Sequence, residues 1–349
     1  MSRSRLSLHC RRAAPATARA SSGFTLIELM VALVLGLIVI AGVISVFLAN
    51  QQVYRTNQAI GDVQDGSRIA FEMMAHDIRG AALTGCSNNG LISNVLKYGP
   101  TAGGTTWWAN TANAVHGYDL TEADPAIAFG TTSSPPTRLA NTSSLELLGA
   151  TDLGLSVLTN NPVAALMTIN GTSTAIQTGD VMIVCDPDHA AIFQITAYDG
   201  VNAVTYLSGT GTPGNCSQGL GYPPVCTAAG ISYTFGPNSQ LAKLTAVDWF
   251  IGTNPVGGRS LYRSDLENKV AVPTPTAQEM VRDVTAMNIL YHQPPQTTFV
   301  RASAITNWVV VDAVQVTLTV ASTDKRAGTN VQAIARTFSA TTTVRNRVN

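Results

Sequence analysis

Gly23-Phe24-Thr25-Leu26-Ile27-Glu28 opens an apolar run that ends at Ala49 and contains one charged residue, Glu28. The segment before it has no acidic residue and five arginines. A helix of roughly 20 apolar residues can cross a bilayer, and flanking arginines stay on the cytoplasmic side. The sequence therefore predicts one membrane span over residues 24–49, with its N-terminus in the cytoplasm and the following residues outside.

Three features distinguish this segment from a secretory signal peptide. Gly23, a small residue, precedes the apolar run, whereas a secretory cleavage site follows it. The run also exceeds the roughly 7–15 apolar residues of such a signal. Glu28 lies inside the run, and a carboxylate at the centre of a bilayer costs about 2.5–3.5 kcal/mol, which favours a function for this residue.

Gly23, Phe24 and Glu28, at this spacing and at the start of an apolar run, resemble the processing site of type IV prepilins and of the pseudopilins of type II secretion. The resemblance implies that a prepilin peptidase cuts between Gly23 and Phe24, on the cytoplasmic side, and that the new N-terminal Phe24 is methylated. Residues 1–23 would then be a cleaved leader. The alternative is a plain membrane anchor in which Glu28 has no role.

Glu28 is the residue that we expect to act in assembly. Cleavage would give Phe24 an α-amino group, which is largely cationic because its reference pKa is near 7.7–8.0. Glu28 follows one helical turn later, where a helix N-terminus favours its charge by about 0.3–1 kcal/mol. Its partner is either the amine of its own Phe24 or that of a neighbouring subunit, and the two pairings can alternate. Pairing between subunits would set the register of a filament, because opposite charges attract more strongly in apolar surroundings than in water.

The predicted mature chain is acidic. The full chain has 21 basic and 21 acidic residues, and five of the basic ones lie in residues 1–23, which leaves 16 basic residues and a net charge near −5. No basic patch indicates a nucleic-acid partner. The charged fraction is only 12%, which is typical of an extracellular β-rich domain. Residues 85–349 are enough for one large domain or two small ones.

The cysteines predict two disulfides. Cys10 lies in the predicted leader, and the four others, an even number in an exported segment, allow three pairings. Cys216 and Cys226 flank a Gly- and Pro-rich stretch, which favours a local pair and leaves Cys86 to pair with Cys185. The alternative is a four-cysteine metal site, but the chain has no CxxC pair and the spacing is irregular.

Three regions follow from these patterns. Residues 1–23 are the leader, residues 24–84 a long helix that includes the span 24–49, and residues 85–349 an extracytoplasmic β-rich head. No proline lies between residues 24 and 99, and apolar residues recur at three- and four-residue steps to about Leu83, which predicts an amphipathic continuation of the helix. A helix of roughly 90 Å needs packing, so its second half should lie against the head.

Gly36 and Gly42 lie in the first half of this helix, and each weakens it by about 1 kcal/mol relative to Ala. Pilins in filaments are similar in having a locally unwound helix segment, and we expect such a segment at these two glycines. Close helix packing is the alternative.

The head begins with irregular structure over residues 85–140, which are rich in Gly, Asn, Thr and Pro. Trp107-Trp108 is either an exposed contact for another subunit or, as we favour, an aromatic plug under a long loop. Met280–Tyr291 has helical spacing at its start and suits a strand at its end. The other expected strands are Leu145–Leu148, Val181–Val184, Ile192–Ala197, Ala203–Leu207, Ile231–Phe235, Leu244–Ile251, Ser260–Arg263, Val309–Val320 and Ala333–Val344. The predicted class is α+β and pilin-like, with a long N-terminal helix packed on a β-rich C-terminal head.

Several downstream segments resemble the PilW type of minor pilin. They are Trp249–Asn254, Arg259–Arg263, Val281–Tyr291, Trp308–Val320 and Thr343–Arg347. The resemblance implies insertion in the inner membrane with the head in the periplasm, then assembly into a pilus at the cell surface. The implied partners are the prepilin peptidase, the major pilin, other minor pilins, the pilus assembly platform and a pilus-tip adhesin. The rivals are a minor pseudopilin of type II secretion and a membrane-tethered adhesin or binding module.

No enzyme motif is present: the chain has no GxSxG, P-loop or HExxH. Cys185-Asp-Pro-Asp-His189 brings two carboxylates and an imidazole together, but a capped turn after a strand is the interpretation we favour over a metal site. We therefore expect no catalytic residue, no cofactor and no metal.

Overall fold

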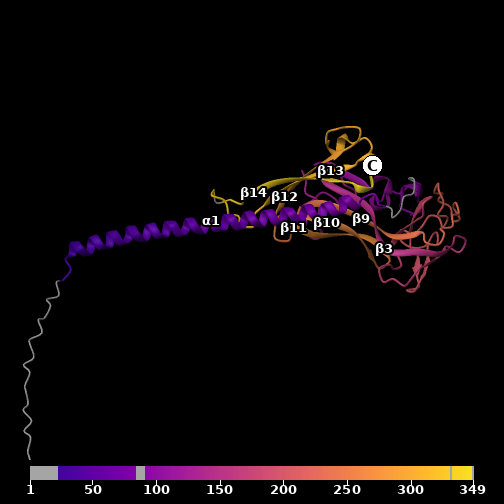
Figure 1. Ribbon diagram of the computed structural model, residues 1–349, viewed down its shortest axis with the longest axis horizontal. Coiled ribbons are helices and arrows are strands. Elements are labelled where there is room, and N and C mark those ends of the chain that lie inside the picture. The colour runs from indigo at the N-terminus through magenta and orange to yellow at the C-terminus, as the bar shows by residue number, and fades with distance from the viewer. Residues whose placement is uncertain (1–22, 84–90, 331, 348–349) are drawn as a thin grey trace, which may run out of the picture. The chain divides into compact units, whose positions relative to one another are not determined.

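The computed structural model describes residues 23–83, 91–330 and 332–347 (Figure 1). The chain divides into two compact units, Met1–Tyr54 and Arg55–Asn349. Helix α1, Leu26–Gly80, begins in the first unit and ends in the second. It begins two residues inside and ends four residues inside the predicted limits of 24 and 84, and it is helical through Gly36 and Gly42. An unwound segment in a filament therefore remains a prediction.

The rest of the described chain is mostly β-structure. The first group of strands is β1 (Ile92–Asn94), β2 (Val115–Tyr118), β3 (Ser144–Asn161), β4 (Leu166–Ile169), β5 (Val181–Cys185), β6 (Ala190–Gln194), β7 (Ala197–Tyr198) and β8 (Ala203–Thr205). The second group is β9 (Gln240–Thr253), β10 (Arg259–Lys269), β11 (Val272–Arg282), β12 (Val284–His292), β13 (Ala313–Ala321) and β14 (Ala335–Thr343). This confirms the α+β class, with one long apolar helix followed by a β-rich domain.

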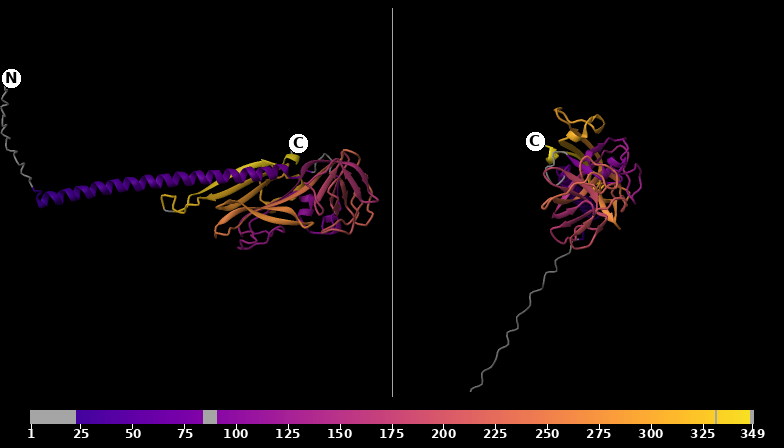
Figure 2. Two further views of the ribbon diagram at one scale, coloured as in Figure 1. Left: turned by 90° about the horizontal axis from the view of Figure 1, so that it is seen from below. Right: turned by 90° about the vertical axis from the view of Figure 1, so that its right-hand side faces the viewer.

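Two sheets form within the described residues. The larger is centred on the antiparallel pair β3 and β9, and it has the order β1-β6-β5-β9-β3-β4-β8-β7, with β10 and β11 added beside β9 and β2 beside β3. The smaller has the order β12-β13-β14 and is antiparallel throughout. Figure 2 shows the two sheets beside the second half of α1.

The core beside the helix explains why residues 55–80 belong to the head. Val63, Met74 and Ile78 are each 1% exposed, and they lie in one apolar cluster with residues from the inner faces of both sheets. Trp249 of β9 and Val316 of β13 are examples from the two sides. The apolar stripe of the amphipathic pattern is thus the face that the two sheets cover.

Three predicted strands are wrong in detail. The predicted strand Val309–Val320 begins only at Ala313, because Trp308–Val310 is a turn of 3-10 helix. Ile231–Phe235 is not a strand. Phe235 is instead buried in an apolar cluster with residues of β5 and β6, and the Tyr233 ring contacts His189. The helical spacing at the start of Met280–Tyr291 is also misleading, because these residues form strands on either side of a bend at Asp283, whose φ is +59°. Apolar residues at three-residue steps in a β-rich context therefore do not decide between helix and strand.

Strand β11 is not among the predicted strands. It contains Pro273 and Pro275, and proline within a segment argues against a strand. Among the described strands, β11 pairs with β10 alone, so it lies at the edge of the sheet. Proline is tolerated there because its missing N–H is not needed by a second neighbour. Residues 91–140 are otherwise as irregular as predicted, with two short strands and several single turns of 3-10 helix.

Candidate assembly site

The first turn of α1 contains the predicted processing residues. Gly23 and Phe24 precede the helix, and the Phe24 side chain is 83% exposed. The Thr25 hydroxyl accepts a hydrogen bond from the backbone N–H of Glu28 at 3.3 Å, and its carbonyl accepts one from Leu29 at 3.1 Å. Thr25 is therefore the N-cap, and Thr25-x-x-Glu28 has the S/T-x-x-E pattern of a capping box.

Thr25 is a residue that the sequence analysis overlooked. Its signal was present, because a threonine three residues before a glutamate at the start of an apolar run predicts a helix N-terminus. The cap places the exposed Glu28 in the first helical turn, where the partial positive charge of the helix end favours a carboxylate.

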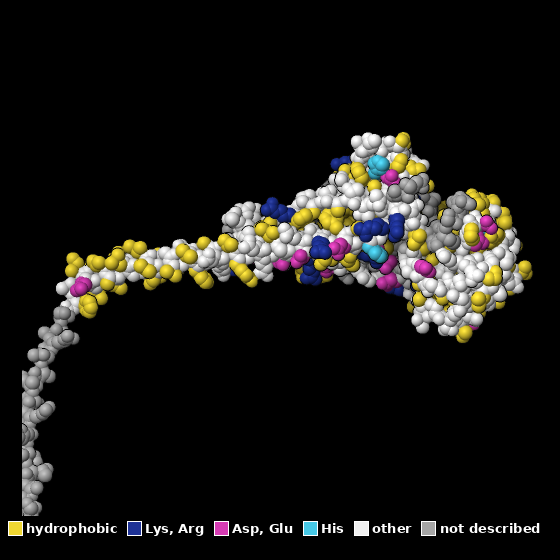
Figure 3. All heavy atoms as spheres, viewed as in Figure 1, with side chains coloured by type: hydrophobic (Ala, Val, Ile, Leu, Met, Phe, Trp, Pro, Cys, Tyr) yellow, Lys and Arg dark blue, Asp and Glu magenta, His cyan; other side chains and the backbone are white. Residues whose placement is uncertain are grey.

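Among the described residues of its own unit, nothing buries the apolar side chains of the first half of α1. Leu37 and Phe47 are each 65% exposed, and none of the most apolar stretch is buried. Figure 3 shows hydrophobic side chains along this part of the helix. By length and composition α1 can cross a membrane. Apolar residues on all sides of a helix need lipid or other apolar helices around them.

The second half of α1 is held to the head by Asp77. Its Oδ2 accepts hydrogen bonds from the Trp249 indole N–H at 2.9 Å and from Arg263 Nε at 2.8 Å. Arg263 also donates to Asp265 at 2.8 Å. These four residues form the helix–head junction. The Asp77 side chain is only 11% exposed, so this carboxylate belongs to the junction and not to the solvated face of the helix.

The closing segment of the chain reinforces the end of the helix. Asn346 donates to the Ala81 carbonyl at 3.1 Å, and Arg347 donates to the carbonyls of Trp308 and Val311. A partly buried guanidinium that donates to backbone carbonyls holds chain segments together instead of offering a free charge. Burial lowers the pKa of Arg347 from its ordinary value.

The segments that resemble the PilW type thus contribute to this end of the helix. Trp249, Arg263, Trp308 and Arg347 come from four of them, and each contacts either the helix or the closing segment that binds the helix end. Residues that lie far apart in the sequence therefore act together to hold the long helix against the head.

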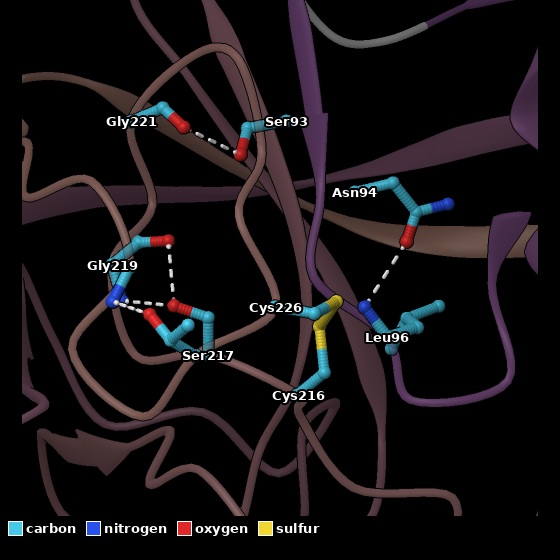
Figure 4. Close-up of a disulfide and its surroundings, with 10 residues drawn as sticks. Ser93, Asn94, Leu96, Cys216, Ser217, Gly219, Gly221 and Cys226 are labelled. Atoms are coloured by element: carbon cyan, nitrogen blue, oxygen red, sulfur yellow. Dashed lines mark hydrogen bonds between the residues drawn. A yellow bond between two sulfur atoms is a disulfide. The ribbon is translucent and has the colours of Figure 1, made fainter. Parts of the chain in front are cut away.

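The disulfide between Cys216 and Cys226 has a Cα–Cα distance of 4.9 Å and closes a turn-rich loop (Figure 4). The backbone N–H of Cys216 donates to the Val95 carbonyl, and Ser93 donates to the Gly221 carbonyl, so the loop is also tied to the start of the head. Cys185 is disulfide-bonded. Its predicted partner, Cys86, lies outside the described residues, as does Cys10, and the second pairing remains a prediction.

Cys185-Asp-Pro-Asp-His189 forms a tight turn. Asp186 Oδ1 accepts hydrogen bonds from the backbone N–H groups of Asp188 and His189, each at 3.0 Å. The His189 ring is buried against Tyr233 and Phe235. In the part of the chain that the structure describes, no group of three or more His, Cys, Asp or Glu residues is placed to hold a metal ion. The arrangement agrees with the capped turn.

Trp107 and Trp108 are 8% and 5% exposed and pack in an apolar cluster with Leu148 and Ile183. This is the aromatic plug that the sequence analysis favoured. The pair stabilises the irregular segment and offers little surface to another subunit.

The head contains a second group of ionisable residues, well away from its surface. Glu146 of β3 and Asp248 of β9 are directly opposite each other, and both are buried. Burial, reinforced by the nearby charge of Asp124, raises the pKa of Glu146 to about 9, and burial raises that of Asp248 well above its ordinary value. Arg138 lies close but donates to backbone carbonyls, including that of Thr142. At neutral pH Glu146 therefore holds a proton, and burial favours the protonated form of Asp248 as well.

The comparison with known families finds one match. Residues 18–44 match the prokaryotic N-terminal methylation motif. This match supports a type IV pilin-like protein. It covers less than a tenth of the chain and includes Gly23, Phe24, Thr25 and Glu28. Neither the search of curated proteins nor that of solved structures gives a match.

For this pilin-like chain the motif implies processing by a prepilin peptidase and assembly with other pilins in a membrane system. It also supports a single-pass anchor with the rest of the chain outside the membrane, and it points to a structural protein more than to an enzyme. The first half of α1 fits both inferences, since its most apolar stretch is not buried by any described residue.

Proposed function

We propose that the chain is a PilW-type minor pilin, cut between Gly23 and Phe24, methylated on Phe24 and assembled into a pilus through its helix, in a tip or priming complex. The head would face the periplasm before assembly and the cell surface afterwards. Major and minor pilins, the assembly platform and a tip adhesin would be its partners, with no cofactor required. The observation that best supports the proposal is the capped first turn, which places Glu28 at the N-terminal end of an exposed apolar helix.

The first test is the mature N-terminus. Replacement of Gly23 by the bulky Val should block cleavage, whereas Gly23→Ala should be processed slowly. The Cβ of neither variant would meet another atom of the described chain within 4 Å, so the effect belongs to the peptidase and not to folding. Mass spectrometry of the assembled protein should find N-methyl-Phe24 as the first residue. A mature protein that still carries residues from 1–23 would refute the processing site.

The second test concerns Glu28. Glu28→Ala and Glu28→Gln should both insert in the membrane, because loss of an intramembrane carboxylate makes insertion easier. If its charge pairs with a neighbouring Phe24 amine, both should enter sheared pili at about a tenth of the wild-type amount or less, the result of losing about 1.4 kcal/mol. Normal incorporation of processed Glu28→Ala would contradict the role of the residue. Loss of type II secretion with normal piliation in a deletion strain would favour the pseudopilin.

A further inference from the structure

Strand β14, shown in yellow in Figure 1, has an unoccupied edge. It is the last strand of the small sheet and pairs with β13 alone. Among the described residues, no backbone or side-chain group makes a hydrogen bond to its outer edge. Most of its residues are exposed, and the partly buried Phe338 and Ala340 lie on the inner face.

The register fixes which backbone groups face outward. Ser322 donates to the Ile334 carbonyl at one end of the β13–β14 pair, and Val344 donates to the Asp312 carbonyl at the other. Hydrogen-bonded and non-bonded pairs alternate in an antiparallel ladder, so the even-numbered residues of β14 face β13. The N–H and C=O groups of the odd-numbered residues therefore point away from the sheet: Ala335, Thr337, Ser339, Thr341 and Thr343.

The side chains of these residues do not occupy the open edge. The Thr337 and Ser339 hydroxyls lie 3.1 Å from the hydroxyls of Thr319 and Thr317 on β13. These contacts keep the side chains on the face of the sheet and stiffen β14 in its extended form. A pre-ordered edge loses less conformational entropy when another strand pairs with it.

Natural sheets usually protect such an edge with prolines, bulges or several charges. Strand β11 is protected in this way by Pro273 and Pro275. Strand β14 has nine residues without a proline, its register is continuous, and Arg336 is its only charged residue. An edge of this length and regularity is a template for strand addition.

Charge indicates the kind of strand that would bind. Residues 325–349 contain five basic residues and no acidic one, whereas residues 24–324 contain eleven basic and all 21 acidic residues. Exposed Lys325, Arg336 and Arg345 lie before, on and after β14. A second copy paired edge to edge would bring these cations together, which is unfavourable. An extended segment with carboxylates would be complementary.

We propose that the outer edge of β14 binds an extended, carboxylate-bearing segment of another protein by adding a strand to the small sheet. The proposal goes beyond the assembly role, since it rests on the head alone and holds whether the helix enters a pilus or a secretion system. Backbone pairing would supply affinity, and the flanking cations would select the partner and its register.

The test uses the full mature chain in nanodiscs and a fluorescent alternating Glu-Val peptide of about eight residues, roughly the length of β14. Ser339→Pro removes one outward N–H and blocks the edge, and Ser339→Ala is the matched control that keeps the N–H. We expect Ser339→Pro to weaken binding at least about ten-fold and Ser339→Ala to leave it unchanged, while Arg336→Glu weakens it about three-fold or more. A Lys-Val peptide should bind less tightly than the Glu-Val peptide.

Hydrogen exchange gives a readout that does not depend on how a proline variant folds. In the free protein the amides of residues 337, 339 and 341 should exchange quickly and those of residues 338 and 340 slowly. The peptide should slow the odd-numbered amides alone. Binding without this protection would overturn the proposal, because it would show electrostatic capture without strand pairing. Protection that grows with protein concentration in the absence of peptide would overturn it in favour of a second copy.

Discussion

The two halves of α1 contain similar apolar side chains but differ in what covers them. Leu37 and Phe47 in the first half are each 65% exposed, whereas Met74 and Ile78 in the second half are 1% exposed. The first half is apolar on all sides, and the second has one apolar stripe that both sheets cover. One continuous helix thus needs two environments. The head supplies the apolar environment of the second half. A membrane or other apolar helices must supply the environment of the first half.

Shortening an apolar side chain in each half should give the largest difference in the stability of the head. Met74→Ala should lower the free energy of unfolding of the head by about 2–5 kcal/mol, because it removes a buried side chain and leaves a cavity. Leu37→Ala, the matched change in the exposed half, should leave head unfolding unaltered. Urea denaturation followed by the fluorescence of the buried tryptophans measures both variants. Equal effects would show that the first half also packs on the head.

The helix–head junction should give the next largest effect. Asp77→Ala removes the acceptor for Trp249 and Arg263, and it should cost about 2–3 kcal/mol of head stability, since a charged hydrogen bond is lost and its donors remain partly buried. Asp65→Ala, an exposed carboxylate on the same helix, should change stability by less than about 0.5 kcal/mol. If the two variants were equal, the junction would contribute nothing to holding the helix.

The sequence predicted the first half of α1 more completely than the second. An apolar run that begins with Gly23 and Phe24, and whose only charged residue is Glu28, indicates its environment directly, and the methylation motif supports that interpretation. The junction was not predictable from a single residue, because Asp77 is bound by groups 172 and 186 residues away in the chain. Periodicity predicted the apolar stripe that includes the buried Met74, but it could not distinguish a solvated carboxylate from Asp77, which is bound by the distant Arg263.

The stability of the head should depend on pH because of its buried carboxyls, which the first half of the helix lacks. The pKa of Glu146 is raised to about 9 in the folded head, above its ordinary value near 4.5, so the folded state binds more protons between these values. Its contribution to stability is fully present below pH 4.5 and is lost as pH rises towards 9, by at most about 1.4 kcal/mol per pH unit. The raised pKa of Asp248 acts in the same direction.

The test compares thermal unfolding of wild type and Glu146→Gln at pH 5.5 and pH 8. The wild-type head should melt at a lower temperature at pH 8, and Glu146→Gln should show a flatter dependence because its side chain does not ionise. Glu72→Gln, at an exposed salt bridge with Arg68, is the control and should follow wild type. A wild-type head that is more stable at pH 8 would contradict the proton-bearing carboxyl.

The smallest effect should come from the cap of the first half. Thr25→Val keeps the shape of the side chain but loses the hydroxyl that accepts from the Glu28 N–H, at a cost of about 1 kcal/mol to the first turn. Thr25→Ser keeps the hydroxyl and is the matched control. In detergent micelles the Glu28 amide of the Val variant should exchange about five-fold faster, the factor that corresponds to 1 kcal/mol, while head stability should not change.

Because Glu28 can pair with a Phe24 amine only if the first turn is formed, incorporation into filaments should fall in Thr25→Val and not in Thr25→Ser. Unchanged exchange in the Val variant would mean that Glu28 is held without the cap, and the register of the first turn would then have to come from neighbouring helices.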